Sequence, residues 1–176
     1  MLCCYVTDRR EGDLLAFAKR AIDDGVDFIQ VREKDLSARE LLQLVCRIRD
    51  LATGSKTRVL VNDRVDVALA AKIDGVHLPG NGLPSERVRA LVSLLGVSTH
   101  SFAELLAAEK AGADFAVFGP IFATPGKKAV GLETLRSVTS AVRMPILAIG
   151  GCHKGNAHLI TEAGAAGYAA IREFQK

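Results

Sequence analysis

The sequence predicts an α/β protein, a single compact (β/α)₈ barrel domain that spans residues 1–176. Short apolar segments alternate with amphipathic helical patterns from one end of the chain to the other. Hydrophobic residues make up 49% of the chain but aromatic residues only 5%, so aliphatic side chains must fill the core. Eight strand–helix units fit into 176 residues only if the connecting loops are short.

The strand candidates are dense in β-branched and aliphatic residues and lack strict alternation, which is typical of strands covered on both faces. They are Cys3–Thr7, Phe28–Arg32, Val59–Asn62, Val76–Leu78, Val97–Thr99, Phe115–Phe118, Ile146–Ile149 and Tyr168–Ile171. Because helical patterns separate them, these strands should run parallel. An open doubly wound sheet is the alternative, but no Gly-x-Gly-x-x-Gly motif follows the first strand.

The segments between the strands carry signals for the start and the end of helices. Ser37 and Glu40 form a capping-box pattern ahead of apolar residues at helical spacing, and Ser101 and Glu104 repeat this pattern. Pro84 suits the first turn of another helix. Glycines that follow a helical pattern and precede a strand indicate left-handed turns that end helices, at Gly25, Gly75, Gly112 and Gly164.

Composition and charge exclude several classes of partner. The net charge is +3 with lysines and arginines spread along the chain, which does not indicate nucleic acid but suits an anionic metabolite. The four cysteines match no zinc pattern, and we expect a cytoplasmic protein without signal peptide or membrane segment. Only about one helical turn follows the last strand candidate. We therefore expect a short or truncated final helix and a homodimer that covers this side.

Polar residues follow the second and third strand candidates, and the active site of a barrel forms at such strand ends. Gln30, Arg32 and Lys34 place an amide and two cations together, which suits an anion, although a solvated charged loop is the alternative. Asn62 and Asp63 offer oxygen ligands for Mg²⁺. Asp63 could instead cap a helix over 64–72, and the local sequence favours this capping role.

The fifth and sixth strand candidates end in a hydroxyl row and a long loop. Ser98 and its neighbours can hydrogen-bond a ligand, whereas His100 is more typical of a structural residue at the start of a helix. The longest irregular segment, 119–128, contains two prolines and two glycines, and such loops often close over a ligand. Lys127 could bring positive charge to a bound phosphate, or serve solubility alone.

Two glycines follow the seventh strand candidate. Gly150 and Gly151 leave room for backbone amides to approach an anion, at the place where barrels often bind phosphate. The loop after the eighth strand, which commonly completes such a site, offers Arg172. Together these strand ends indicate a site for a phosphorylated small molecule.

The order and spacing of several segments resemble the thiamin phosphate synthase and TenI family over nearly the whole chain. The segments that carry the resemblance are 5–8, 30–34, 61–66, 75–78, 98–101, 118–124 and 149–151. The resemblance implies a TIM barrel and a transferase of thiamin biosynthesis. Such a transferase couples hydroxymethylpyrimidine pyrophosphate to thiazole phosphate and releases pyrophosphate.

The resemblance also implies roles for individual residues. Arg32, Lys34 and Lys127 would be catalytic, because the departing pyrophosphate needs its growing negative charge neutralised. Asp63 would be a ligand of Mg²⁺. The substrate-binding residues would be Gln30, Asn62, Ser98, Thr124, Gly150, Gly151 and Arg172.

Three departures from the synthase pattern keep other functions open. Gly82 occupies the position of the second metal-binding Asp of the synthases. Their Ser-rich phosphate turn is replaced by residues 171–172, and the segment 124–127 lacks one of their hydroxyl groups. TenI-like thiazole tautomerases need no metal and also lack that second Asp, but their catalytic His falls at Pro120 in this chain. A TenI-like tautomerase and a non-catalytic binder of thiazole phosphate or thiamin phosphate are the alternatives.

Overall fold

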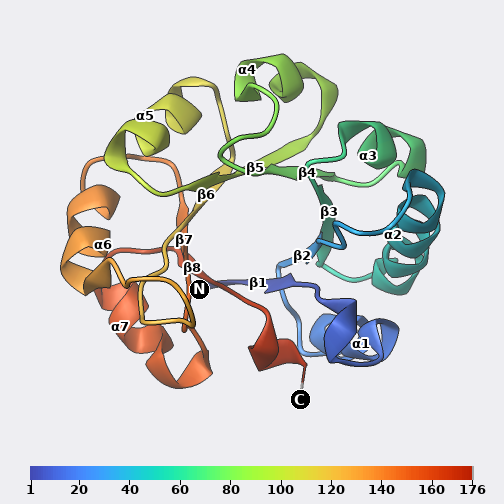
Figure 1. Ribbon diagram of the computed structural model, residues 1–176, viewed down its shortest axis with the longest axis horizontal. Helices are drawn as coiled ribbons and strands as arrows, with labels where there is room; N and C mark the ends of the chain where they lie inside the picture. Colours follow the sequence, from blue (N-terminus) through green and yellow to red (C-terminus); the bar gives the residue numbers. More distant parts are fainter. Residues whose placement is uncertain (176) are drawn as a thin grey trace.

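A computed structural model describes residues 1–175 and has a closed parallel barrel at its centre (Figure 1). The strands are hydrogen-bonded in the order of the sequence, and β8 closes the barrel on β1. They are β1 (Leu2–Val6), β2 (Phe28–Val31), β3 (Arg58–Asn62), β4 (Gly75–Leu78), β5 (Leu94–Thr99), β6 (Phe115–Phe118), β7 (Ile146–Ile149) and β8 (Gly167–Ala170). The predicted barrel is confirmed, and its largest boundary difference is the earlier start of β5.

Helices form the outer layer of the barrel (Figure 1). They are α1 (Leu14–Asp23), α2 (Ala38–Ala52), α3 (Val65–Ala71), α4 (Ser85–Val88), α5 (Phe102–Lys110), α6 (Gly131–Thr139) and α7 (Ala157–Glu162). Short 3-10 turns are η1 (Arg9–Glu11), η2 (Arg89–Leu91), η3 (Lys154–Asn156) and η4 (Arg172–Phe174). No helix within residues 1–175 is long and apolar enough to cross a membrane.

The predicted helix starts are confirmed in part. The capping box of Ser37 and Glu40 is complete, with each residue bonded to the backbone of the other. The Ser101 hydroxyl accepts from the Glu104 amide, but the Glu104 carboxylate accepts from the His100 amide instead of returning to Ser101. The second capping box is therefore only half formed, because the Glu104 carboxylate binds His100, the residue before the N-cap Ser101.

One of the predictions of a helix-ending glycine is wrong. Gly25, Gly112 and Gly164 adopt the left-handed conformation expected of them, but Gly75 lies inside β4. The preceding helix, α3, ends instead on Lys72, which takes the left-handed conformation itself. A Cβ atom on Gly75 would lie 1.7 Å from the carbonyl oxygen of Leu94, so Gly75 is required by the close approach of β5.

The two faces of the strands build two separate cores. Outward side chains pack against the helices, whereas inward side chains fill the barrel with an apolar cluster. Within this inner cluster the rings of Phe28 and Phe115 stack with their centroids 5.0 Å apart. The members of the inner cluster are Cys4, Val6, Phe28, Leu60, Leu94, Phe115, Val117, Leu147 and Ala169. Polar inward positions remain toward the carboxyl ends of the strands, at the barrel mouth.

Candidate active site at the barrel mouth

Inward positions on β2 to β5 bring polar side chains together at the barrel mouth. The buried Gln30 donates from Nε2 to Oδ1 of Asn62 at 3.2 Å, across β2 and β3. On β4 and β5, Nε2 of His77 lies 2.8 Å from Oγ of Ser98. Asn62 and His77 are register partners, so the two hydrogen-bonded pairs lie next to each other. They form a continuous polar wall over four neighbouring strands.

His77 is a member of this wall to which the sequence analysis assigned no role. Its neighbours Val76 and Leu78 belong to the outer core, so alternation along β4 directs the His77 ring into the barrel. Burial lowers the pKa of His77 to about 3, and the positive charge of Arg32 adds to this effect. Strand alternation is the signal that could have placed this ring in the site.

The depressed pKa of His77 predicts a loss of stability in acid. Between about pH 6.5 and about pH 3 the unfolded chain binds a proton at His77 that the folded chain excludes, so stability falls as the pH falls. We expect the free energy of unfolding to drop by about 2 kcal/mol more in the wild type than in His77→Gln between about pH 7 and about pH 4.5. Urea denaturation at both pH values measures this difference. Equal losses in the two proteins would contradict the prediction.

Arg32 follows β2 and is anchored through its backbone to the end of β1. Its amide donates to Oγ1 of Thr7 at 3.0 Å, and this hydroxyl donates to Oε1 of Glu33 at 2.6 Å. The buried Glu33 carboxylate also accepts from the Arg9 amide at 3.2 Å. Arg32 is half-buried and this network holds its backbone, whereas Lys34 is exposed, so the choice between an anion site and a solvated charged loop stays a prediction. Sequence reasoning missed Thr7 and Glu33, because only the fold brings them together.

Asp63 does not cap the helix that follows it. The N-cap residue of α3 is Arg64, and no side-chain hydrogen bond caps this helix, so the capping interpretation is wrong. Asp63 instead adopts a left-handed turn with φ 65°, and its amide donates to the carbonyl of His77 at 3.0 Å. Among residues 1–175, no hydrogen bond or ion pair engages the Asp63 carboxylate. This leaves both of its oxygens available at the mouth.

Gly82 lies directly beside Asp63. A Cβ atom on Gly82 would be 2.9 Å from Oδ1 of Asp63 and 2.9 Å from Cδ of Pro79. Within residues 1–175, no group of three or more His, Cys, Asp and Glu side chains is arranged to hold a metal ion. A single carboxylate still fits Mg²⁺, which often keeps several waters and binds one or two carboxylates together with substrate phosphates.

The glycine turn after β7 packs against the long loop after β6. Gly150 and Gly151 both have left-handed backbones, with φ 91° and 67°. The Phe122 amide donates to the Gly150 carbonyl at 3.0 Å, and Nδ2 of Asn156 donates to the Gly151 carbonyl at 2.9 Å. A Cβ atom on Gly151 would lie 2.8 Å from Cβ of Phe122. The turn is thus fixed from two sides, and no side chain of its own covers its amides.

The loop 119–128 carries two of the predicted site residues. Thr124 and Lys127 pair as an antiparallel bridge, with the Lys127 amide 3.0 Å from the Thr124 carbonyl. Lys127 is exposed, and Arg172 is exposed at the start of η4. Gln30 and Asn62 share a side-chain hydrogen bond, but among residues 1–175 no side-chain hydrogen bond or ion pair joins Lys127 or Arg172 to another predicted site residue. They share with the rest of the site the carboxyl end of the barrel.

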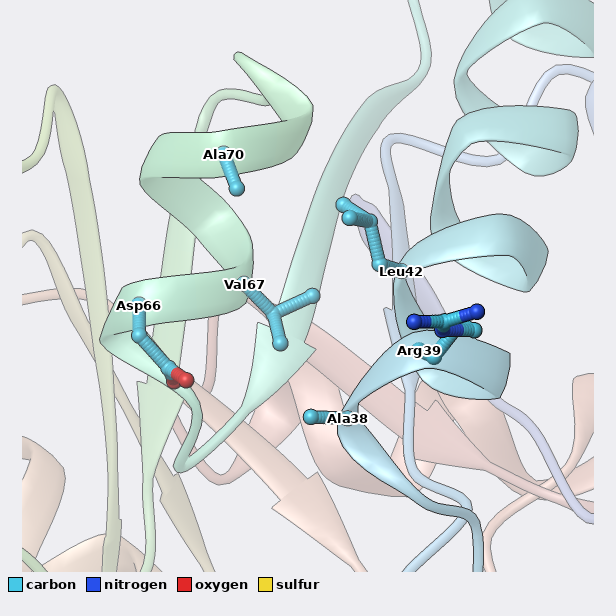
Figure 2. Close-up of a pocket in the computed structure, with 6 residues that line it drawn as sticks. All are labelled: Ala38, Arg39, Leu42, Asp66, Val67 and Ala70. Atoms are coloured by element: carbon cyan, nitrogen blue, oxygen red, sulfur yellow. The ribbon is translucent and has the colours of Figure 1, made fainter.

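A separate hollow of about 250 Å³ lies in the outer layer of the barrel, between α2 and α3 (Figure 2). Its walls are largely aliphatic, and the charged side chains come from one residue on each helix. Asp66 is held there by an ion pair with Arg64 at 2.6 Å. The lining residues are Ala38, Arg39, Leu42, Asp66, Val67 and Ala70. This hollow is distinct from the polar wall inside the barrel.

The fold and the strand ends define a (β/α)₈-barrel protein with cations, amides and a glycine turn gathered at its mouth. A family model described as thiamine monophosphate synthase matches residues 3–174, and the chain belongs to this family. The resemblance noted from the sequence is thereby confirmed.

Similar proteins cover most of the chain. A putative thiamine-phosphate synthase of Geobacter sulfurreducens is 44% identical over an alignment of 176 positions, which covers 94% of this chain and 83% of that protein. The thiamine-phosphate synthase of Chlorobium limicola is 40% identical over an alignment of 175 positions, which covers 96% of this chain and 83% of that protein. The solved structure of a thiamine phosphate pyrophosphorylase from Pyrococcus furiosus has a TM-score of 0.89 and 35% identity, covering 97% of this chain and 85% of that one.

Proposed function

We propose that this protein couples hydroxymethylpyrimidine pyrophosphate to thiazole phosphate, forming thiamin phosphate and releasing pyrophosphate. The observation that carries the proposal is the polar wall from β2 to β5, bordered by Arg32 and Asp63. The wall suits a polar heterocycle with an anionic leaving group. The glycine turn after β7 suits the phosphate of the second substrate. Family membership and the relatives' printed names point to the same reaction.

The residues of the wall bind the pyrimidine substrate in this proposal. The Gln30–Asn62 bond uses one donor and one acceptor, and the remaining donors and acceptors of both amides serve the ligand. Ser98 lies further along the wall and contacts the pyrophosphate. Thr124, Gly150, Gly151 and Arg172 hold the thiazole phosphate, whose charge the Arg172 guanidinium matches.

The reaction breaks one bond and forms another. The C–O bond between the pyrimidine methylene and the pyrophosphate breaks, and its electron pair leaves with the pyrophosphate. The thiazole ring nitrogen then donates its lone pair to the methylene carbon and forms the C–N bond. Arg32, Lys34 and Lys127 neutralise the charge that grows on the leaving oxygen. No general base is needed, because no proton leaves a carbon or an attacking hydroxyl.

Asp63 is the residue that would hold Mg²⁺, assisted by pyrophosphate oxygens and water. Bound Mg²⁺ supplies additional positive charge to the leaving group. Asn81, next to Gly82, is a neutral and weaker ligand. The homodimer and the cytoplasmic location expected from the sequence stay predictions.

The test is a synthase assay with purified protein, both substrates and Mg²⁺, in which we expect thiamin phosphate to form. A tautomerase assay on thiazole carboxylate phosphate runs on the same sample, and calorimetry shows whether both substrates bind. Bound substrates without product at high protein concentration would overturn the proposal. If the tautomerase assay yields isomerised thiazole, the protein is a tautomerase. If the substrates bind and neither reaction occurs, the protein has a binding role.

Gly82→Asp should increase Mg²⁺ affinity on the order of tenfold, because it places a second carboxylate beside Asp63. The new Cβ atom would crowd Oδ1 of Asp63 and Cδ of Pro79, so the 79–82 turn must shift slightly. Gly82→Asn is the matched control, since it brings the same crowding without the charge. The Mg²⁺ concentration at half-maximal turnover measures the effect. If both variants behave alike, Asp63 is not a metal ligand.

A further inference from the structure

We propose that His77 is a positioning residue, which holds the Ser98 hydroxyl so that its hydrogen points at the anionic substrate. This inference rests on the proposed function, since it deepens the role of Ser98 in the same site. The observation behind it is a fully buried ring with one nitrogen on Ser98 and the other nitrogen without a partner among residues 1–175.

The His77 ring has a fixed place between neighbouring strands. Gly96 is its register partner on β5, and a Cβ atom there would lie 2.8 Å from Nδ1 of His77 and 2.4 Å from Cζ of Phe115. The centroids of the His77 and Phe115 rings are 5.9 Å apart, with the planes tilted by 45°. The missing side chain at Gly96 therefore makes the space into which both rings fit, and the edge of His77 that carries Nδ1 faces that space.

This placement decides which nitrogen carries the proton. A ring that is 2% exposed and has no carboxylate partner stays neutral, so it has a single N–H group. A proton on Nδ1 would be a buried donor without an acceptor, which is costly. A proton on Nε2 is satisfied by Ser98, and Nδ1 is then left as an acceptor without a partner, which carries no proton that must be satisfied, in the space beside Gly96 that Phe115 also borders. The geometry thus assigns the proton to Nε2, which donates to Ser98.

The direction of this bond sets what Ser98 offers to a ligand. Because its oxygen accepts from His77, the hydroxyl hydrogen of Ser98 is free to turn toward the open mouth. It can then donate to a pyrophosphate oxygen, and a hydrogen bond to a charged acceptor is among the stronger ones. In the opposite direction, the hydrogen would be used on His77 and oxygen lone pairs would face the anion.

The experiment measures the affinity of inorganic pyrophosphate with Mg²⁺ by calorimetry, together with kcat and KM for the pyrimidine substrate. His77→Leu should weaken pyrophosphate binding by about tenfold, as expected for one charge-assisted hydrogen bond. His77→Gln should restore most of this loss, because its amide nitrogen can reach the place of Nε2. His77→Asn should not, because its amide nitrogen reaches only the place of Nδ1.

A double-mutant cycle separates positioning from structural support. In a Ser98→Ala background, His77→Leu should change pyrophosphate affinity by less than about twofold, because the hydroxyl it orients is gone. Thr99→Val is the matched control, since it removes a buried hydroxyl from the outward face of the same strand and should leave affinity unchanged. A full-sized His77→Leu effect without Ser98, or equal effects of Gln and Asn, would overturn the proposal. If His77→Leu does not fold, the Gln and Asn variants decide alone.

The two proposals can fail separately. Absence of thiamin phosphate formation by the wild type overturns the synthase function. The coupling between His77 and Ser98 in pyrophosphate binding is measured without turnover and tests the positioning role by itself. A wild type that turns over but shows no coupling overturns only the positioning role.

Discussion

Arg32→Gln should lower kcat for thiamin phosphate formation by about a thousandfold, because it removes a positive charge that stabilises the leaving group. Arg32 is half-buried at the end of β2, and its backbone is fixed by Thr7 and Glu33. A backbone that is already in place limits the reorganisation needed to bring the guanidinium to the leaving group as negative charge develops. Gln keeps hydrogen-bonding capacity, so the loss reports the charge.

Single-turnover kinetics at saturating substrate measure this effect. Arg10→Gln is the matched control, because Arg10 is an exposed cation near the same mouth whose charge is engaged with Asp8 at 2.6 Å. It should keep kcat within about threefold of the wild type, as befits an exposed ion pair. Similar losses in both variants would mean that the general positive potential matters and that Arg32 has no specific role.

Gly151→Ala should raise KM for thiazole phosphate by about a hundredfold, while KM for the pyrimidine substrate changes little. The left-handed backbone strains the new side chain, and its Cβ atom would lie 2.8 Å from Cβ of Phe122. Either the glycine turn or the loop 119–128 must then move. A displacement of about 1 Å in a binding site can cost on the order of a hundredfold.

Gly54→Ala separates backbone strain from crowding at the site. Gly54 also has a left-handed backbone, with φ 80°, but no atom lies within 4 Å of the added Cβ atom, and it precedes β3 at the far end of the barrel. Gly54→Ala should lose about 1 kcal/mol of stability from backbone strain alone, and Gly151→Ala should lose more because crowding is added, as thermal unfolding measures. Only Gly151→Ala should raise KM for thiazole phosphate, and an unchanged KM would place the phosphate elsewhere.

Much of the fold follows from local patterns in the sequence. Continuous apolar segments predicted each of the strands, and the capping box at Ser37 predicted the start of α2. Gly75 shows where local reasoning ends. A glycine before a strand looks the same in sequence whether it ends a helix or admits a neighbouring strand, and only the approach of Leu94 distinguishes the two cases.

The residues of the candidate site were likewise predictable from the sequence only in part. The position of Gln30, Arg32, Asn62 and Ser98 at the barrel mouth was predictable because each stands at a strand end, where barrels place their chemistry. The Asp63 capping interpretation failed because a left-handed turn removed that carboxylate from α3. The roles of Thr7, Glu33 and His77 depend on partners from other strands, and no local pattern in the sequence specifies those partners.

The polar wall occupies only one half of the barrel. Inward positions on β6, β7, β8 and β1 are apolar, and they include Val117, Ile149, Ala169 and Val6. In the proposed reaction, the half of the barrel that carries the polar wall can therefore stay unchanged and still ionise the pyrimidine pyrophosphate. Mutations in the apolar half can meanwhile reshape the pocket for the thiazole ring. Descendants of such a chain could accept a different nucleophilic ring in place of thiazole and keep the residues that activate the pyrimidine pyrophosphate.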